Sequence, residues 1–325
     1  MRLLVLGGTR FVGRALVEEA LTRGWDVTAL HRGRTGVLPD AVTALHADRT
    51  DPEQLGAALH GRSFDLAVDT WASAPRVVRD AARLVEAGRS AYVSSQSVYR
   101  WGSHVDERSP LVDGDPDAGE SDYAADKRGG ELASRPEALL LRVGLILGPY
   151  EDVGRLPWWL TRVARGGRVV APGRPDRPLQ YVDVRDLAAF ALDALARGES
   201  GQVDVTAPSG HATTRTLLEA CVAATGSDAE LVWVDEETLE RLGVQPWTQL
   251  PVWVPERGEF AGFLESDVSR AVGLGLRCRP VEQTVDDTWA WLQREGAPAQ
   301  RADRPAHGLP EELERAVLEQ ASARS

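Results

Sequence analysis

The chain has 325 residues, 43% of them hydrophobic, which is enough for one α/β domain and a smaller substrate-binding part. Its 49 acidic residues outnumber 37 Lys and Arg, and the net charge of −12 argues against a function built on attraction to nucleic-acid phosphates. Because the first strand starts without a leader and no apolar run can cross a bilayer, we expect a cytoplasmic protein that binds neither nucleic acid nor membrane.

The first expected element is a strand at 3–6, an apolar run typical of a strand buried on both faces of a parallel sheet. A glycine-rich turn and an amphipathic helix follow, as they do where a dinucleotide pyrophosphate is held. Gly7 would make the tight turn, and Gly13 would let the helix pack close to the strand. A plain structural turn would also use these glycines, and Arg10 stands where a further glycine is usual. The candidate pyrophosphate-binding residues are Gly7, Thr9, Arg10, Phe11, Val12 and Gly13.

The second expected strand, 26–30, leads into a basic stretch at 31–34. An NAD site usually has an acidic residue at this point, which accepts a hydrogen bond from the ribose 2′-hydroxyl. Arg32 and Arg34, together with Arg10, can instead clamp a 2′-phosphate. The sequence therefore predicts a preference for NADP(H), with NAD(H) as the second option. A solvated turn would explain the same residues without any cofactor.

Strands and helices continue to alternate after this point. Strands are expected at 44–48, 64–69, 90–94 and 139–143, with helices beginning near 51 and 75. This βαβ alternation predicts an α/β fold with a Rossmann-type, doubly wound parallel sheet, in which ligands bind beyond the carboxyl ends of the strands. Asp48 at such an end can accept from an adenine amino group or cap the next turn. Further cofactor candidates at these strand ends are Arg49, Thr70 and Ser94.

Beyond the expected strand at 90–94, the chain carries a set of three residues that suit acid–base chemistry on a carbonyl. Tyr123 and Lys127 are four residues apart, so they project from one helix face, where the ammonium favours the phenolate and can bond the nicotinamide ribose. Ser95 can donate to the substrate oxygen and stabilise negative charge that develops on it. Tyr-x-x-x-Lys also occurs by chance on solvated helix faces, but its position after the fifth strand favours catalysis here. The loop at 101–122 is expected to cross this site.

The rest of the chain is less regular. We expect a dinucleotide-binding core at 1–150, a substrate-binding region at 151–295 interleaved with returning core elements, and a polar linker with a terminal helix at 296–325. Ten of the 20 aromatic residues are tryptophans, which favours a flat, largely apolar substrate, although each indole can equally be core packing. Two cysteines without a CxxC motif and six scattered histidines offer no metal site. Candidate substrate contacts are Trp71, Gln96, Trp158, Trp159 and Gln180.

The chain resembles extended or atypical short-chain dehydrogenases/reductases of the NAD-dependent epimerase/dehydratase family. The likeness rests on the turn at 7–13, the segments 92–99 and 123–127, and the stretches 141–149 and 181–187. It implies a Rossmann fold, a nicotinamide cofactor and catalytic roles for Ser95, Tyr123 and Lys127. Because many relatives dimerise, it also implies a homodimer.

Two departures from the family pattern bear on the substrate. Leu179 stands where an arginine for a nucleotide-sugar diphosphate is usual, and Gly144 replaces a substrate-contacting asparagine. We therefore predict an NADP(H)-dependent oxidoreductase that transfers hydride to or from a carbonyl or alcohol of a small, largely apolar molecule. The first alternative is an epimerase or dehydratase with tightly bound NAD(P) that acts on a sugar nucleotide. The second is a non-catalytic RNA-associated or regulatory protein, because the turn at 7–13 and the segment 31–35 also resemble chloroplast stem-loop RNA-binding proteins.

Overall fold

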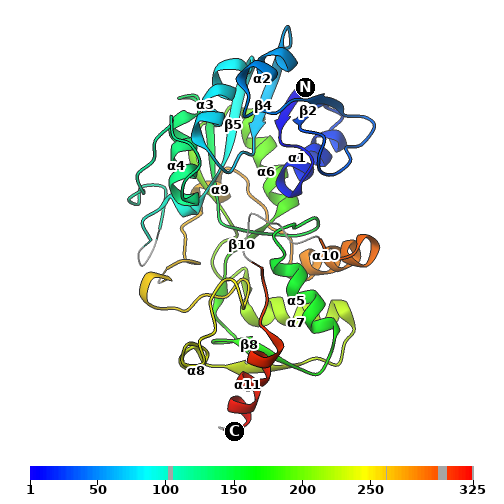
Figure 1. The fold of residues 1–325 in the computed structure, drawn as a ribbon, viewed down its shortest axis with the longest axis vertical. Helices are drawn as coiled ribbons and strands as arrows, with labels where there is room; N and C mark the ends of the chain where they lie inside the picture. The colour runs from blue at the N-terminus through cyan, green and yellow to red at the C-terminus, as the bar shows by residue number, and fades with distance from the viewer. Residues whose placement is uncertain (102–104, 261, 299–305, 324–325) are drawn as a thin grey trace.

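The computed structural model describes residues 1–101, 105–260, 262–298 and 306–323. The molecule is elongated, with an N-terminal half built on a large sheet at the top of Figure 1 and a smaller half at the bottom. The C-terminus lies at the far end of the lower half, whereas the N-terminus lies in the upper half (Figure 1).

Seven parallel strands form the large sheet, in the order β11-β6-β5-β4-β1-β2-β3. The strand order reverses between β1 and β4, which is the arrangement of a doubly wound sheet, so the predicted Rossmann-type α/β fold is confirmed. These strands are β1 (Arg2–Leu6), β2 (Asp26–His31), β3 (Thr43–His46), β4 (Phe64–Asp69), β5 (Ala87–Ser95), β6 (Leu139–Val143) and β11 (Gly201–Val205).

Helices cover both faces of this sheet because its strands are apolar on both faces. In β1, Leu3 and Val5 pack into the core under α1 (Phe11–Thr22) and α6 (Val184–Arg197). The alternating Leu4 and Leu6 belong to the core on the opposite face. The helices on that opposite face are α2 (Pro52–Leu59), α3 (Pro75–Leu84) and α4 (Tyr123–Ala133).

The lower half is built from small sheets and helices around a second core. Its strands pair two by two: β7 (Leu145–Leu147) with β10 (Tyr181–Asp183), β8 (Arg168–Pro172) with β13 (Glu230–Val234), and β9 (Pro178–Leu179) with β12 (Ala212–Thr213). Its longer helices are α5 (Arg155–Ala164), α7 (Thr214–Thr225), α8 (Glu236–Arg241), α10 (Val281–Glu295) and α11 (Glu311–Ser322). The chain returns to the upper half in α6, β11 and α9 (Ser269–Gly273).

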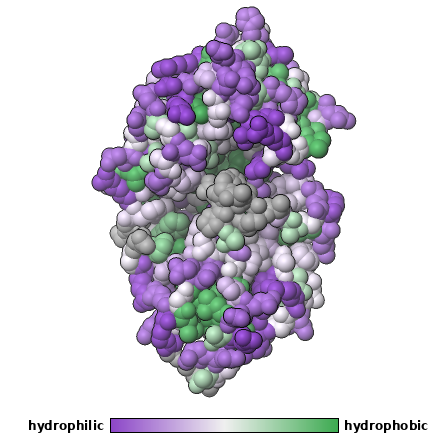
Figure 2. Space-filling model, in the orientation of Figure 1, coloured by the Kyte–Doolittle hydropathy of each residue, from purple (hydrophilic) through white to green (hydrophobic). Residues whose placement is uncertain are grey.

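The polar surface of the molecule carries apolar areas of different sizes. Figure 2 shows scattered small apolar areas on the upper half and a larger one on the lower half. Within the described ranges, no helix is both long and apolar enough to span a bilayer.

Candidate active site

The turn between β1 and α1 has the geometry of a pyrophosphate-binding turn. Gly7 has φ +106°, a left-handed conformation that favours glycine, and a Cβ at Gly13 would overlap the carbonyl oxygen of Gly7. Helix α1 begins without a side-chain cap and without an acidic residue in its first turn. The backbone N–H groups and partial positive charge at this helix end therefore suit an anionic ligand.

A cavity of about 340 Å³ lies beside this turn. The hydroxyl of Thr9 lies 3.0 Å from that of Thr35, which joins the glycine turn to the loop after β2. Arg10 points toward the lower half, with Nη1 3.5 Å from Oδ2 of Asp152, so it is not placed with the other arginines expected to clamp a 2′-phosphate. The lining residues include Thr9, Arg10, Phe11, Arg14, Thr35, Tyr150, Asp152 and Trp291, whereas Val12 packs against the core.

Arg32 and Arg34 are exposed at the end of β2 and act on the charge of Asp48. The pKa of Asp48 is lowered first by hydrogen bonds from Thr50, and the two guanidinium groups add to the effect. Oδ1 of Asp48 accepts from the Thr50 N–H at 3.0 Å and from its hydroxyl at 2.7 Å. Asp48 was expected either to accept from an adenine amino group or to cap the next turn. The structure shows the turn cap, and the adenine contact stays a prediction.

Arg49 and Thr70 are used to hold strand ends together. Arg49 is buried and forms two hydrogen bonds with Asp69, Nη1 to Oδ1 at 2.7 Å and Nη2 to Oδ2 at 2.5 Å. This ion pair ties the chain after β3 to the end of β4, and the cofactor contact of Arg49 stays a prediction. Thr70 donates to the carbonyl of Leu6 at 2.9 Å and lies against Gly7.

Lys127 joins helix α4 to strand β5. Its side chain is 3% exposed, and Nζ donates to the carbonyl oxygens of Trp71 at 2.7 Å and Val93 at 2.6 Å. Tyr123 is the first residue of α4, which Asp122 caps by accepting from two backbone N–H groups. Because Val93 lies two residues before Ser95, this lysine brings the start of α4 to the carboxyl end of β5.

Two tyrosines lie close together at this point, and burial distinguishes them. Tyr92 lies under Lys127, with Nζ 4.8 Å from its ring centroid, and its hydroxyl donates to the Trp71 carbonyl at 3.1 Å. Burial raises the pKa of Tyr92, and the negative charges of Asp69 and the neighbouring Tyr123 raise it further. Tyr92 therefore stays protonated, whereas Tyr123 is partly exposed.

The two serines at the end of β5 face different partners. Ser94 is buried and donates to Oε1 of Glu131 at 2.8 Å, and its expected cofactor contact stays a prediction. Glu131 also pairs with the buried Arg142, whose Nε lies 2.8 Å from Oε1. Ser95 is partly exposed and caps a short 3₁₀ turn (Gln96–Val98) by accepting from the Ser97 N–H at 3.1 Å. The hydroxyl of Ser95 thus lies at the sheet edge with Tyr123 and Lys127.

Four of the expected substrate contacts have structural partners. Trp71 donates from its indole N–H to the Ala74 carbonyl at 3.1 Å. Trp159 is 1% exposed in the second core and donates to the Pro251 carbonyl at 2.7 Å, and Trp158 packs edge-on against it. Gln180 donates to the carbonyls of Ala207 and Ser266 and accepts from the Ser266 N–H, so it joins two loops. Gln96 is the fifth expected contact, and it lies next to Ser95 at the sheet edge.

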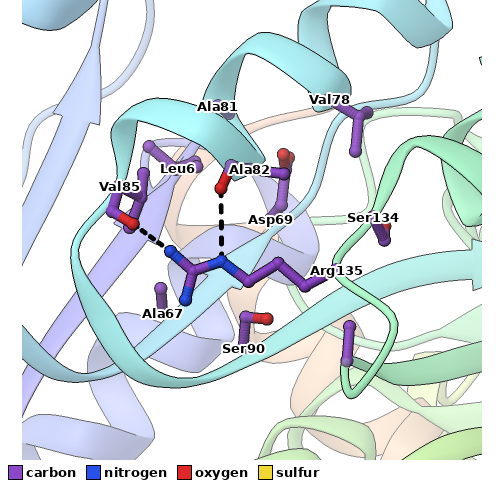
Figure 3. A pocket seen from close by; sticks show the side chains of 11 residues that line it. Leu6, Ala67, Asp69, Val78, Ala81, Ala82, Val85, Ser90, Ser134 and Arg135 are labelled. Carbon is purple, nitrogen blue, oxygen red and sulfur yellow. Dashed lines mark hydrogen bonds between the residues drawn. The ribbon is translucent and has the colours of Figure 1, made fainter.

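A second, much smaller cavity lies behind the sheet. It measures about 40 Å³ and is lined mostly by apolar side chains of β4 and α3. Arg135 crosses it and donates to backbone carbonyls of Ala82 and Val85, which leaves little more than room for water (Figure 3). In the part of the chain that the structure describes, no group of His, Cys, Asp and Glu side chains is placed to hold a metal ion.

Comparison with known proteins identifies a family and several structural relatives. A model of the NAD dependent epimerase/dehydratase family matches residues 3–206. A Streptomyces antibioticus protein described as a dTDP-4,6-dihydroxy-2-methyloxan-3-one 4-ketoreductase is 30% identical over 199 residues, which are 57% of this chain and 65% of that protein. The match therefore spans slightly less than two thirds of that protein's length.

Solved structures resemble the chain over most of its length. The Bordetella bronchiseptica enzyme WbmH, solved with NAD+, has a TM-score of 0.66 at 18% identity, over 91% of this chain and 99% of that chain. Thermus thermophilus UDP-glucose 4-epimerase, solved with NAD, has a TM-score of 0.63 at 21% identity, over 91% of this chain and 100% of that chain. Likeness at this level of identity shows a common fold.

Proposed function

Because this chain belongs to the NAD-dependent epimerase/dehydratase family, a family of NAD-dependent enzymes, we propose that it exchanges hydride between a nicotinamide dinucleotide and a carbonyl or alcohol carbon. The observation that carries this proposal is the placement of Ser95, Tyr123 and Lys127 at one sheet edge. That edge is also where the uncapped end of α1 lies, since ligands of such sheets bind at the strand carboxyl ends.

The turn at 7–13 fits a dinucleotide, because only glycine is tolerated at Gly7 and Gly13 and the end of α1 has no side-chain cap. The backbone of Phe11 and Val12 would hold the pyrophosphate, and Asp48, Arg32 and Arg34 would surround the adenosine. When bound, the nicotinamide ring supplies or takes up the hydride.

The side chains of the protein would transfer the proton and stabilise the charge on the substrate oxygen. In the reductive direction Tyr123 gives its phenolic proton to that oxygen, and in the oxidative direction it accepts one. The Ser95 hydroxyl donates to the same oxygen and stabilises its negative charge. The Lys127 ammonium would donate to the nicotinamide ribose when the cofactor is bound.

NADP(H) is the cofactor that the strand end favours, although the two structural relatives named above contain NAD. Strand β2 ends in His31 and is followed by Arg32 and Arg34, with no carboxylate among them to accept from a ribose 2′-hydroxyl. Two exposed guanidinium groups suit a 2′-phosphate better.

Substitution of Tyr123 by Phe tests the proposal. We expect Tyr123→Phe to lower kcat by at least about 10³-fold, because the acid–base group is lost, and to change the Kd of NADPH less than about twofold. Tyr181→Phe is the matched control, since Tyr181 is buried in the lower half. Activity that survives in Tyr123→Phe would show that another group moves the proton.

A second candidate is an epimerase or dehydratase that acts on a nucleotide sugar with a permanently held cofactor. The comparisons support it no more than the first candidate, because one structural relative is a UDP-glucose 4-epimerase whereas the Streptomyces antibioticus relative is described as a ketoreductase. The purified protein would then release stoichiometric NAD(P) on acid denaturation and would need none added. An exchangeable cofactor consumed during turnover indicates the oxidoreductase instead.

The remaining alternatives receive less support from the structure. Trp159, which was expected to contact a flat, apolar substrate, belongs to the second core, as does Trp253. Phe263 has its ring centroid 4.6 Å from that of Trp101 and 5.1 Å from that of Trp247. This aromatic cluster suits contact with an aromatic group of a substrate. Family membership and the presence of all three catalytic candidates favour catalysis over the RNA-associated alternative.

A further inference from the structure

Three adjacent strands end in register beside Ser95. Ser95 of β5 pairs with Val143 of β6, and Val143 pairs with Val205 of β11. The residues that follow these three are Gln96, Gly144 and Thr206, so they form the next row beyond the sheet edge, where ligands of such sheets bind. The row therefore begins directly beside the hydroxyl that is proposed to contact the reacting oxygen.

The two side chains of this row are buried without hydrogen-bond partners. Gln96 is 5% exposed and Thr206 is 1% exposed. Among the described residues, neither Nε2 of Gln96 nor Oγ1 of Thr206 has a partner. Buried polar groups are rarely left unpaired in folded proteins, because their desolvation is not compensated. Two such groups in one row indicate a ligand that supplies the missing hydrogen bonds.

Gly144 makes room for both side chains. A Cβ at this position would lie 2.9 Å from Oε1 of Gln96 and 3.2 Å from Oγ1 of Thr206. No left-handed backbone conformation requires glycine here, so the requirement is for space. Oε1 of Gln96 and Oγ1 of Thr206 thus both lie over the same glycine.

The loop that carries Thr206 is fixed by Gln180. Nε2 of Gln180 donates to the carbonyl of Ala207 at 3.0 Å and to that of Ser266 at 2.9 Å. Its Oε1 accepts from the Ser266 N–H at 2.6 Å. Gln180, expected from the sequence to contact substrate, is therefore a positioning residue for Thr206.

We propose that Gln96, Gly144 and Thr206 form a subsite for an oxygen substituent on the carbon next to the reacting carbonyl. The amide N–H₂ of Gln96 only donates hydrogen bonds and the Thr206 hydroxyl can donate, so the complementary group is an oxygen acceptor, a hydroxyl or a second carbonyl. The Cα atoms of consecutive residues are about 3.8 Å apart, so the side chains of Ser95 and Gln96 can bind oxygens on neighbouring carbons. A carbon substituent would leave both buried groups unpaired and would be rejected. This inference rests on the proposed function and specifies its substrate class.

The test compares two ketones that differ by one group, 2-hydroxyacetophenone and propiophenone, which carry a hydroxyl and a methyl at the same place. In the NADPH-dependent assay we expect wild-type kcat/KM to favour the hydroxyketone by about tenfold or more, as for a hydrogen-bonded hydroxyl. Thr206→Val and Gln96→Met should bring the ratio close to one, and Gly144→Ala should lower it by crowding both side chains.

Thr43→Val and Gln293→Met are matched controls, because both residues are exposed and lie on β3 and α10, outside this row. They should keep the wild-type ratio. A wild-type ratio near one, or a preference that survives both Thr206→Val and Gln96→Met, would overturn the subsite.

If neither ketone is reduced, the subsite is tested by binding. Quenching of tryptophan fluorescence by each ketone, with NADPH present, gives the two dissociation constants. Tighter binding of 2-hydroxyacetophenone that Thr206→Val abolishes supports the subsite, whereas equal binding or none contradicts it.

Discussion

At the scale of single residues, the choice of cofactor depends on two exposed arginines. Arg32 and Arg34 lie close enough to Asp48 to lower the pKa of its carboxyl, and Asp48 is itself fixed by Thr50. A 2′-phosphate placed there would meet two guanidinium groups. Arg10, paired with Asp152, would contribute little to it.

We therefore expect the double substitution Arg32→Ala and Arg34→Ala to raise the Kd of NADPH by about ten- to a hundredfold, because two charge-assisted contacts are lost. The Kd of NADH should change less than about twofold. Energy transfer from tryptophan to the reduced nicotinamide measures both constants, and the NADPH effect should shrink as salt is added. Arg62→Ala, an exposed arginine outside the site, is the control. Wild-type protein that binds NADH more tightly than NADPH would contradict the clamp.

The sequence suggests candidate site residues from local spacing, but it does not reveal hydrogen-bond partners that lie far away in the chain. Tyr123 and Lys127 are predicted as a pair because a helix places residues four apart on one face, and Ser95 because it follows the fifth expected strand. The bonds of Ser94 to Glu131 and of Arg49 to Asp69 were not predicted, because these partners follow 37 and 20 residues later. No local pattern reveals such pairs.

At the scale of elements, the ends of β5, β6 and β11 are joined by a buried polar network. Arg142 on β6 donates to the Tyr99 hydroxyl at 3.0 Å, and this hydroxyl lies 2.8 Å from Oδ1 of Asp204 on β11. Burial raises the pKa of Asp204 to about 7, and the nearby Glu107 carboxyl adds to the effect. The folded protein therefore favours the protonated form of Asp204.

This network predicts how stability depends on pH. Because the folded-state pKa of Asp204 lies above its unfolded value, its contribution is complete below about pH 4 and is lost as pH rises through about 7. The free energy of unfolding should fall by up to about 1.4 kcal/mol per pH unit in this window. Asp204→Asn should lessen the fall in stability between pH 5 and pH 8, as measured by urea unfolding, and the buried Glu151, whose pKa burial also raises to about 7, keeps part of the slope.

The control is Asp40→Asn, which removes an exposed carboxyl and should leave the profile unchanged. If Asp204→Asn loses as much stability between the two pH values as the wild type, another group causes the dependence.

The alternation of strands and helices could be predicted, but the register between distant strands could not. Strand β11 pairs with β6 only after the chain has passed through the lower half, so Thr206 was not recognised as a neighbour of Gly144 and Ser95. The missing information is a long-range pairing. Periodicity of 2.0 or 3.6 residues does not encode it.

At the scale of the whole molecule, the lower half is closed by the C-terminal helix. Helix α11 packs on β8 and β13, and its Val317 is fully buried in the second core. Glu314 of α11 forms a nearly buried ion pair with Arg162 of α5, with Nε 2.8 Å from Oε2. The sequence predicted a terminal helix within 296–325, but not its docking site on the short strands β8 and β13.

The docking of α11 should contribute to stability and leave cofactor binding unchanged. Glu314→Ala leaves the buried Arg162 charge without its carboxylate, and loss of one partner of a buried pair costs about 3 kcal/mol or more. We therefore expect a lower urea midpoint, with the Kd of NADPH unchanged because the glycine turn lies in the other half (Figure 1). Glu312→Ala, an exposed position on the same helix, should cost less than about 0.5 kcal/mol. Equal losses for the two variants would mean that α11 is not docked in solution, and a parallel loss of NADPH affinity would mean that the two halves unfold as one cooperative unit.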